Sequence, residues 1–179
     1  MKLAIVVGHT AVSGGAVRVT DNVREWDWNR HLAKLIEAHD PLNVKTFLRV
    51  SGGGYTHEIK RVYDEVDVWG ATASIELHFN SVGTPSAHGT ETLSSGTPQS
   101  WKLATVVNTA MVKALGFRNR GLIKRERDER GGLSLWVGRA PAILIEPYFG
   151  SNPKECAIAD RRKDELAEAI YTAARDYHY

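Results

Sequence analysis

The sequence has too little cysteine and too little net charge for several common classes of protein. Cys156 is its only cysteine, which excludes an intrachain disulfide and a cysteine-based zinc site. The formal net charge is only +2, and the one dense charged run, residues 124–130, alternates in sign as a solvated loop does. We therefore expect no nucleic-acid partner, and any metal site has to use histidine and carboxylate ligands.

Long apolar runs are also missing. No stretch is long enough to span a bilayer, so we expect no membrane insertion. The apolar run at residues 3–7 is shorter than the core of a signal peptide, and no small-residue cleavage site follows it. We therefore expect synthesis in the cytoplasm without a signal peptide.

What the sequence does contain is typical of one compact domain over residues 1–179. Its hydrophobic content is 42% and its charged content 25%, both ordinary for a globular protein. Strand-like and helix-like patterns alternate, which predicts an α/β architecture. We expect a monomer, with strands near residues 3–7, 44–50, 73–79, 89–93 and 141–148, and helices near residues 22–38, 55–69, 98–115 and 160–177. Segment 118–138 is polar and bears glycines, and it carries no clear pattern.

Polar side chains follow three of the predicted strands. His9 comes after the first strand, His78 lies near the end of the third, and Glu146 near the end of the last. Glu25 lies close to the start of the first helix, which Asn22 is placed to cap. Because ligands of open α/β sheets bind outside the carboxyl ends of the strands, we expect these side chains to converge.

Two imidazoles and one carboxylate form the ligand set of many zinc hydrolases, in which the fourth position stays open. A further carboxylate that does not bind the metal can then accept a proton from water. Each residue also has a structural interpretation. A single strand-end histidine is usually a cap or core residue, and Glu25 could only favour the helix dipole. Glu146 is harder to explain, because a buried carboxylate is costly unless it is paired. The residues alone leave both interpretations open.

The order of short motifs resembles one known family. The sequence is similar to the amidase_3 family, the zinc N-acetylmuramoyl-L-alanine amidases of bacteria and their phages, in five segments: VGHT at residues 7–10, Glu25, SIELHFNS at 74–81, GTET at 89–92 and AILIEPYFGSN at 142–152. The resemblance implies a twisted, mostly parallel sheet flanked by helices on both faces. It implies His9, Glu25 and His78 as ligands of one zinc ion and Glu146 as the catalytic acid/base.

Three further residues are candidates for contacts around this site. Asn80 follows the second ligand histidine of the family motif, so the resemblance implies a role beside the metal or the substrate. Thr90 belongs to the strand that forms the edge of the family's substrate groove. Asn29 lies one helical turn after Glu25 and is placed to hold that carboxylate.

The function implied is hydrolysis of the amide between N-acetylmuramic acid and L-alanine, with peptidoglycan as the partner. Two other functions stay open: a zinc peptidase, since the same ligand set cleaves peptide bonds, and a wall-binding module without activity. The expected absence of a signal peptide favours a phage or prophage endolysin released by a holin-type lysis route, whereas a bacterial autolysin normally carries an export signal.

Overall fold

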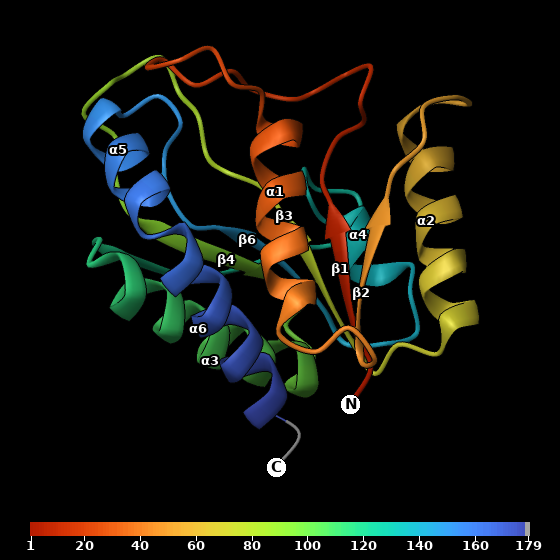
Figure 1. Ribbon diagram of the computed structural model, residues 1–179. Coiled ribbons are helices and arrows are strands. Elements are labelled where there is room, and N and C mark those ends of the chain that lie inside the picture. Colours follow the sequence, from red (N-terminus) through yellow and green to blue (C-terminus); the bar gives the residue numbers. More distant parts are fainter. Residues whose placement is uncertain (178–179) are drawn as a thin grey trace.

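A computed structural model describes residues 1–177, so the last two residues of the expected domain lie outside the described part (Figure 1). The centre of the molecule is a six-stranded sheet in the order β2-β1-β3-β6-β4-β5. The strands are β1 (Leu3–Val7), β2 (Val44–Leu48), β3 (Ala73–Leu77), β4 (Thr90–Ser94), β5 (Asn119–Lys124) and β6 (Ala142–Glu146). Strands β2, β1, β3 and β6 are parallel, whereas β4 pairs with β6 in the antiparallel direction. The expected mostly parallel sheet is therefore confirmed.

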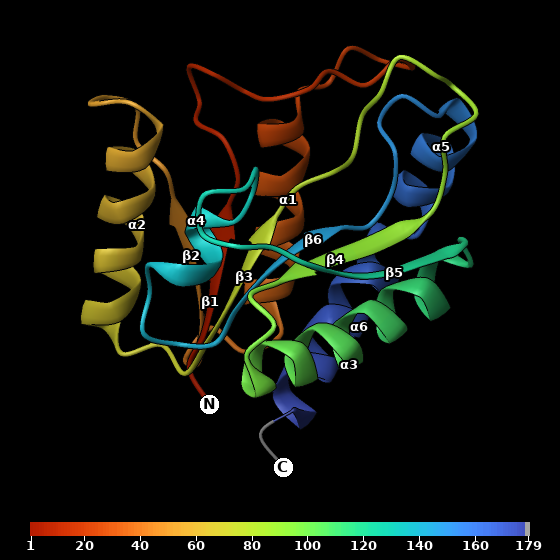
Figure 2. The ribbon, with the colours of Figure 1, turned by 180° about the vertical axis from the view of Figure 1, so that it is seen from behind.

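Helices cover both faces of this sheet, as Figures 1 and 2 show from opposite sides. They are α1 (Glu25–Ala38), α2 (Tyr55–Trp69), α3 (Pro98–Leu115), α4 (Leu133–Trp136), α5 (Pro153–Arg161) and α6 (Lys163–Asp176). Helices α1, α3 and α6 lie on one face and share a hydrophobic core with the side chains of Leu3, Ile5 and Val7. Helices α2 and α4 pack on the other face, against Ala4 and Val6. Because β1 is buried on both faces, its sequence is apolar at every position.

The structure corrects three details of the sequence-based prediction. Strand β5 lies within the segment 118–138 that carried no clear pattern. Residues 153–176 form two helices, and Arg162 separates them, so the closing helix begins at Lys163 and not at residue 160. Helix α1 begins at Glu25, and Asn22 does not cap it, because Asn22 takes a left-handed backbone conformation with φ of 60°. The backbone carbonyls of Ala16 and Gly14 accept the hydrogen bonds of its first two amides instead.

Residues 8–24 form a long loop above the carboxyl ends of the strands, and an ion pair between a buried arginine and an exposed aspartate fixes it. Arg18 is 2% exposed and donates hydrogen bonds of 2.6 and 2.5 Å to the carboxylate of Asp160 in α5. Trp28 of α1 donates to the same carboxylate over 2.8 Å. A buried guanidinium needs such a partner, since its desolvation is costly. The pair therefore ties the loop to two helices and positions the segment that precedes α1.

Within the described residues, no helix is both long and apolar enough to cross a membrane.

Candidate metal centre

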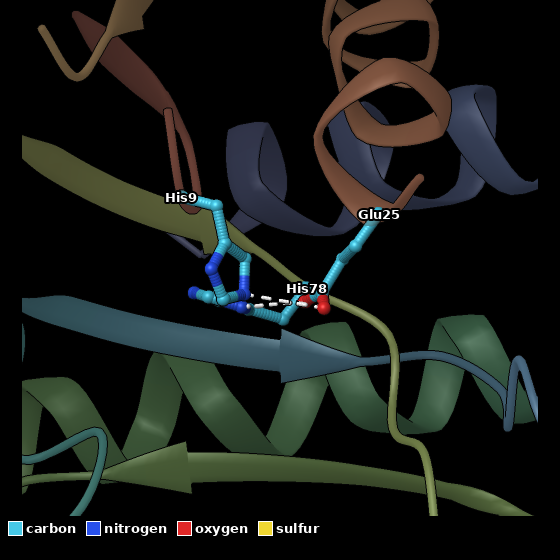
Figure 3. Close-up of side chains that lie close together, drawn as sticks. All are labelled: His9, Glu25 and His78. Atoms are coloured by element: carbon cyan, nitrogen blue, oxygen red, sulfur yellow. Dashed lines mark hydrogen bonds and ion pairs between the residues drawn. The ribbon is translucent and has the colours of Figure 1, made fainter. Parts of the chain in front are cut away.

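The parallel strands bring three distant side chains together at one edge of the sheet (Figure 3). His9 lies two residues beyond the end of β1, and His78 directly follows β3, its neighbour in the sheet. Glu25 is the first residue of α1. One ligand atom from each of the three lies within 4.8 Å of the others. The sequence placed these residues at element ends, and the adjacency of β1 and β3 makes them meet.

Glu25 stands between the two imidazoles. Its Oε1 lies 2.7 Å from Nδ1 of His78, and its Oε2 lies 3.2 Å from Nε2 of His9. The backbone amides of Phe79 and Ala16 also donate to this carboxylate, over 3.2 and 3.1 Å. Burial by itself would raise the pKa of Glu25, but the hydrogen bonds from His78 and His9 outweigh it and hold the pKa well below its usual range. Glu25 is therefore a fixed anion between two nitrogen donors.

Two glycines make room for this cluster. A Cβ on Gly15 would lie 2.7 Å from both Glu25 Oε2 and His9 Nε2, and Gly15 also has φ of +77°. A Cβ on Gly8 would lie 2.4 Å from Nε2 of His78. His9 itself has φ of 65°, which is uncommon for a residue with a side chain and is often found at functional sites. The local backbone is thus shaped around the two imidazoles and the carboxylate.

The cluster fits a divalent cation of the zinc type. Two neutral imidazole nitrogens and one carboxylate oxygen are the ligand set of zinc sites that keep one position open for water or substrate. A neutral histidine that donates from one nitrogen offers a lone pair on the other. Nδ1 of His78 and Oε1 of Glu25 are 2.7 Å apart, and at that distance a lone pair and a carboxylate need a proton or a metal ion between them.

Glu146 lies beside the cluster but not in it. It is the last residue of β6, the strand next to β3, and it lines the same cavity as His9, Glu25 and His78. Its Oε2 is buried and has no hydrogen-bond partner among residues 1–177. Burial raises the pKa of Glu146 to about 8; the charge of His78 opposes this rise, and the charges of Glu25 and Glu91 add to it. A carboxyl group with a pKa near neutrality, open to a cavity, is suited to accept and return a proton.

The cavity has a volume of about 910 Å³ and continues away from the cluster in two directions. Arg49 and Tyr55 line it on the side of α2, and Arg125 and Arg130 line it on the side of the loop after β5. The three ligand residues and Glu146 also line it.

The three candidate contact residues have different outcomes. Asn80 lines the cavity, and its amide donates over 2.8 Å to Glu91. Thr90 is fully buried, and its hydroxyl donates to the carbonyl of Pro147 over 2.7 Å, so its role beside the substrate or behind the site stays a prediction. Side chains alternate along β4, and the neighbouring Glu91 faces the cavity instead.

The expected hydrogen bond between Asn29 and Glu25 is also absent. Asn29 is fully buried, and its two amide atoms have no hydrogen-bond partner among the described residues. The physical reason lies at Glu25, whose two oxygens already accept from both histidines and from two backbone amides.

Sequence reasoning assigned no role to two buried acids of the site. Glu76 is 1% exposed and lies 3.1 Å from Nε2 of His78, and Glu91 holds the amide of Asn80. A signal for Glu76 was present, because it is the one charged residue of β3 and precedes His78 by two residues, so that it shares the face of His78. Arg49, which pairs with Glu76 and Glu58, gave no signal beyond its place after a strand.

Comparison with models of protein families identifies one family. The family model described as N-acetylmuramoyl-L-alanine amidase (Amidase_3) matches residues 3–176. Comparison with curated protein sequences found no significant match.

Among solved structures, the catalytic domain of the amidase CwlV from Bacillus (Paenibacillus) polymyxa var. colistinus is 23% identical, with a TM-score of 0.82 over 99% of this chain and 98% of that one. An N-acetylmuramoyl-L-alanine amidase from Clostridium difficile is 24% identical, with a TM-score of 0.81 over 99% and 96%. The catalytic domain of an endolysin targeting Clostridia difficile is 22% identical, with a TM-score of 0.82 over 98% and 97%. At these identities the structures show that the fold is shared.

Proposed function

We propose, from the premise that the chain belongs to the N-acetylmuramoyl-L-alanine amidase family, that it is a zinc-dependent hydrolase that cleaves the amide between N-acetylmuramic acid and L-alanine in peptidoglycan. The observation that carries the zinc dependence is the convergence of His9, Glu25 and His78, with ligand atoms within 4.8 Å of one another. The open cavity beside this cluster, with Glu146 on its wall, supports the hydrolytic role.

His9, Glu25 and His78 would hold the ion. Zinc bound there would supply Lewis acidity, which polarises an amide carbonyl and favours loss of a proton from water. Glu25 would contribute a negative charge to the site, and the two histidines would bind as neutral ligands.

Glu146 moves the proton. As a carboxylate it accepts a proton from the attacking water, and as a carboxylic acid it returns that proton to the nitrogen of L-alanine, which then leaves as an amine. A raised pKa favours both halves of this cycle, because the group changes protonation state at small energetic cost near neutral pH.

The first prediction concerns this proton transfer. Glu146→Gln should lower kcat by about 10²–10⁴-fold, since general acid–base catalysis contributes a factor of that size. Release of soluble fragments from purified cell walls measures the rate, and metal analysis should show that the variant keeps its zinc. Asp128→Asn is a matched control, because Asp128 is an acid on the wall of the same cavity and is not part of the proposed machinery. Wall lysis by Glu146→Gln at the rate of the unchanged protein would refute the role.

The products separate the amidase from its alternatives. An amidase releases peptides that begin with L-alanine and leaves intact glycan strands, which mass spectrometry identifies. A zinc peptidase would leave L-alanine attached to muramic acid, and a binding module would release nothing.

We further propose that the hydrolysis serves lysis of a bacterial host by a phage, with synthesis in the cytoplasm and release through a holin-type lesion. The resemblance to phage enzymes supports this setting. Expression in bacteria with and without a co-expressed holin tests it, and lysis should require both proteins.

A further inference from the structure

Building on the zinc centre proposed above, we propose that Glu76 is a positioning residue. Its buried carboxylate holds the far nitrogen of His78 and so directs Nδ1 of that ring at the metal. The inference comes from the contacts of His78 at Nε2, the ring nitrogen that does not contact Glu25.

The geometry connects Glu76 to the metal position through one ring. Glu76 and His78 lie two residues apart along β3 and its continuation, so their side chains leave the same face of the sheet. Oε1 of Glu76 is 3.1 Å from Nε2 of His78, and Nδ1 of the same ring is 2.7 Å from Glu25. The ring has little freedom to shift, because Gly8 packs against its Nε2 edge so closely that no Cβ fits there.

This contact selects one arrangement of the imidazole. An ionised carboxylate only accepts hydrogen bonds, so Nε2 of His78 must carry the hydrogen that Glu76 receives. A bound metal ion would take the place of the proton that Nδ1 shares with Glu25, and the lone pair of the neutral ring would then lie on Nδ1, 2.7 Å from that carboxylate. In metal sites, a carboxylate behind a ligand histidine fixes the ring in this way and makes its free nitrogen a better donor.

The burial of Glu76 indicates that its carboxylate has a role at the metal site and not in the packing of the sheet. It is 1% exposed in a strand whose neighbours Ile75 and Leu77 are apolar and fully buried. A carboxylate in such a place is costly unless charges and donors surround it. Packing alone would be satisfied by an apolar side chain, as at Val6, the register partner of Glu76 in β1.

The surroundings compensate the charge of Glu76 without replacing its bond to His78. Arg49 is 7% exposed, and its Nη1 is 3.7 Å from Oε1 of Glu76, which is longer than the 3.1 Å to His78. The hydroxyl of Tyr63 lies 3.5 Å from the other oxygen of Glu76. Arg49 also pairs with Glu58 over 3.3 Å. The shortest of these contacts of Glu76 is therefore the one to the ligand histidine.

The experiment measures zinc affinity, which does not depend on turnover. Zinc-free protein is titrated against a fluorescent chelator of known affinity for the unchanged chain and for Glu76→Leu, Glu76→Gln and Glu58→Gln. Glu76→Leu, which has no acceptor for Nε2, should raise the zinc Kd by about 10–100-fold. Glu76→Gln keeps an acceptor but no charge, so its Kd should rise less. Glu58→Gln removes an acid from the same arginine without contacting His78, and its Kd should stay unchanged.

Nitrogen-15 spectra of the histidine rings in the zinc-loaded, unchanged protein supply a second measurement. They should show His78 bound to zinc through Nδ1 and protonated at Nε2. If Glu76→Leu does not fold, the zinc affinity of Glu76→Gln and these spectra still test the positioning role. Binding of zinc through Nε2 of His78 would overturn the inference, and so would zinc affinity equal to that of the unchanged protein in folded Glu76 variants.

The same data separate this inference from the proposed function. Failure of the unchanged protein to bind zinc would refute the zinc centre itself. Tight zinc binding that does not respond to Glu76 would refute only the positioning role.

Discussion

Two acids of the site differ in the direction in which their surroundings move the pKa. Glu25, held by hydrogen bonds from two histidines, has a pKa well below its usual range, whereas burial raises that of Glu146 to about 8. The first therefore stays an anion, and the second carries a proton at neutral pH in the metal-free protein. Such a separation between neighbouring carboxyl groups is typical of sites in which one acid binds and the other transfers a proton.

The raised pKa of Glu146 predicts how the stability of the metal-free protein depends on pH. In the unfolded chain the carboxyl has its ordinary pKa of 4.5, so between pH 4.5 and about 8 the folded protein holds one proton more. The contribution of this group to the free energy of unfolding is therefore complete below pH 4.5. It falls by about 1.4 kcal/mol per pH unit as the pH rises to about 8. Urea unfolding of chelated protein at pH 5 and pH 8 measures the loss.

Glu146→Gln supplies the comparison for this measurement, since it shares every other titrating group. The unchanged protein should lose a few kcal/mol more than the variant between the two pH values. Equal losses in both proteins would contradict the raised pKa.

Among the elements, helix α5 determines how the segment before β4 is held. Asn152 caps this helix, and its side-chain oxygen accepts from the amides of Lys154 and Glu155 over 3.0 and 3.2 Å. Its amide nitrogen donates over 3.0 Å to the carbonyl of Ala87. Glu155, in the first turn, accepts from the amide of Gly89 over 2.7 Å. The start of α5 therefore fixes the approach to the strand that carries Glu91.

Removal of this cap should destabilise the protein. Asn152→Ala should lower the free energy of unfolding by about 1 kcal/mol, because two amides of the first turn lose their acceptor. Asn152→Asp keeps the acceptor and should recover most of that loss in the same urea titration. If both variants lost the same amount, the contact with Ala87 and not the cap would carry the stability.

Across the whole molecule, a bound ion would connect the end of β1, the start of α1 and the end of β3. Zinc would bind only the folded chain, because those segments meet only there. At free zinc a hundred times its Kd, the gain in stability is about 2.7 kcal/mol. For a chain of this length that raises Tm by about 5–10 °C.

Thermal unfolding with zinc and with chelator tests this coupling. The unchanged protein and Glu146→Gln should both show the zinc-dependent rise in Tm, and His9→Ala should lose it. A rise of the same size in His9→Ala would mean that zinc binds elsewhere.

The sequence by itself determined the type of fold and pointed to the three residues that meet in the candidate metal centre. Alternating strand and helix patterns predicted the α/β sheet, because each period reflects which side chains are buried. His9, Glu25, His78 and Glu146 were predicted from their places at element ends together with the order of family motifs. These predictions depend on local patterns, which a linear chain displays directly.

Only the tertiary structure decided which side chains touch. Strand β5 was not predicted, because it lies at the edge of the sheet and its sequence, half-buried and polar, has no strand period. The outcomes at Thr90, Asn29 and Glu76 depended on the face that each presents and on which acceptors were already occupied. At Thr90 and Glu76 such contacts arise from the register of neighbouring strands, and one residue of shift would turn either side chain to the opposite face.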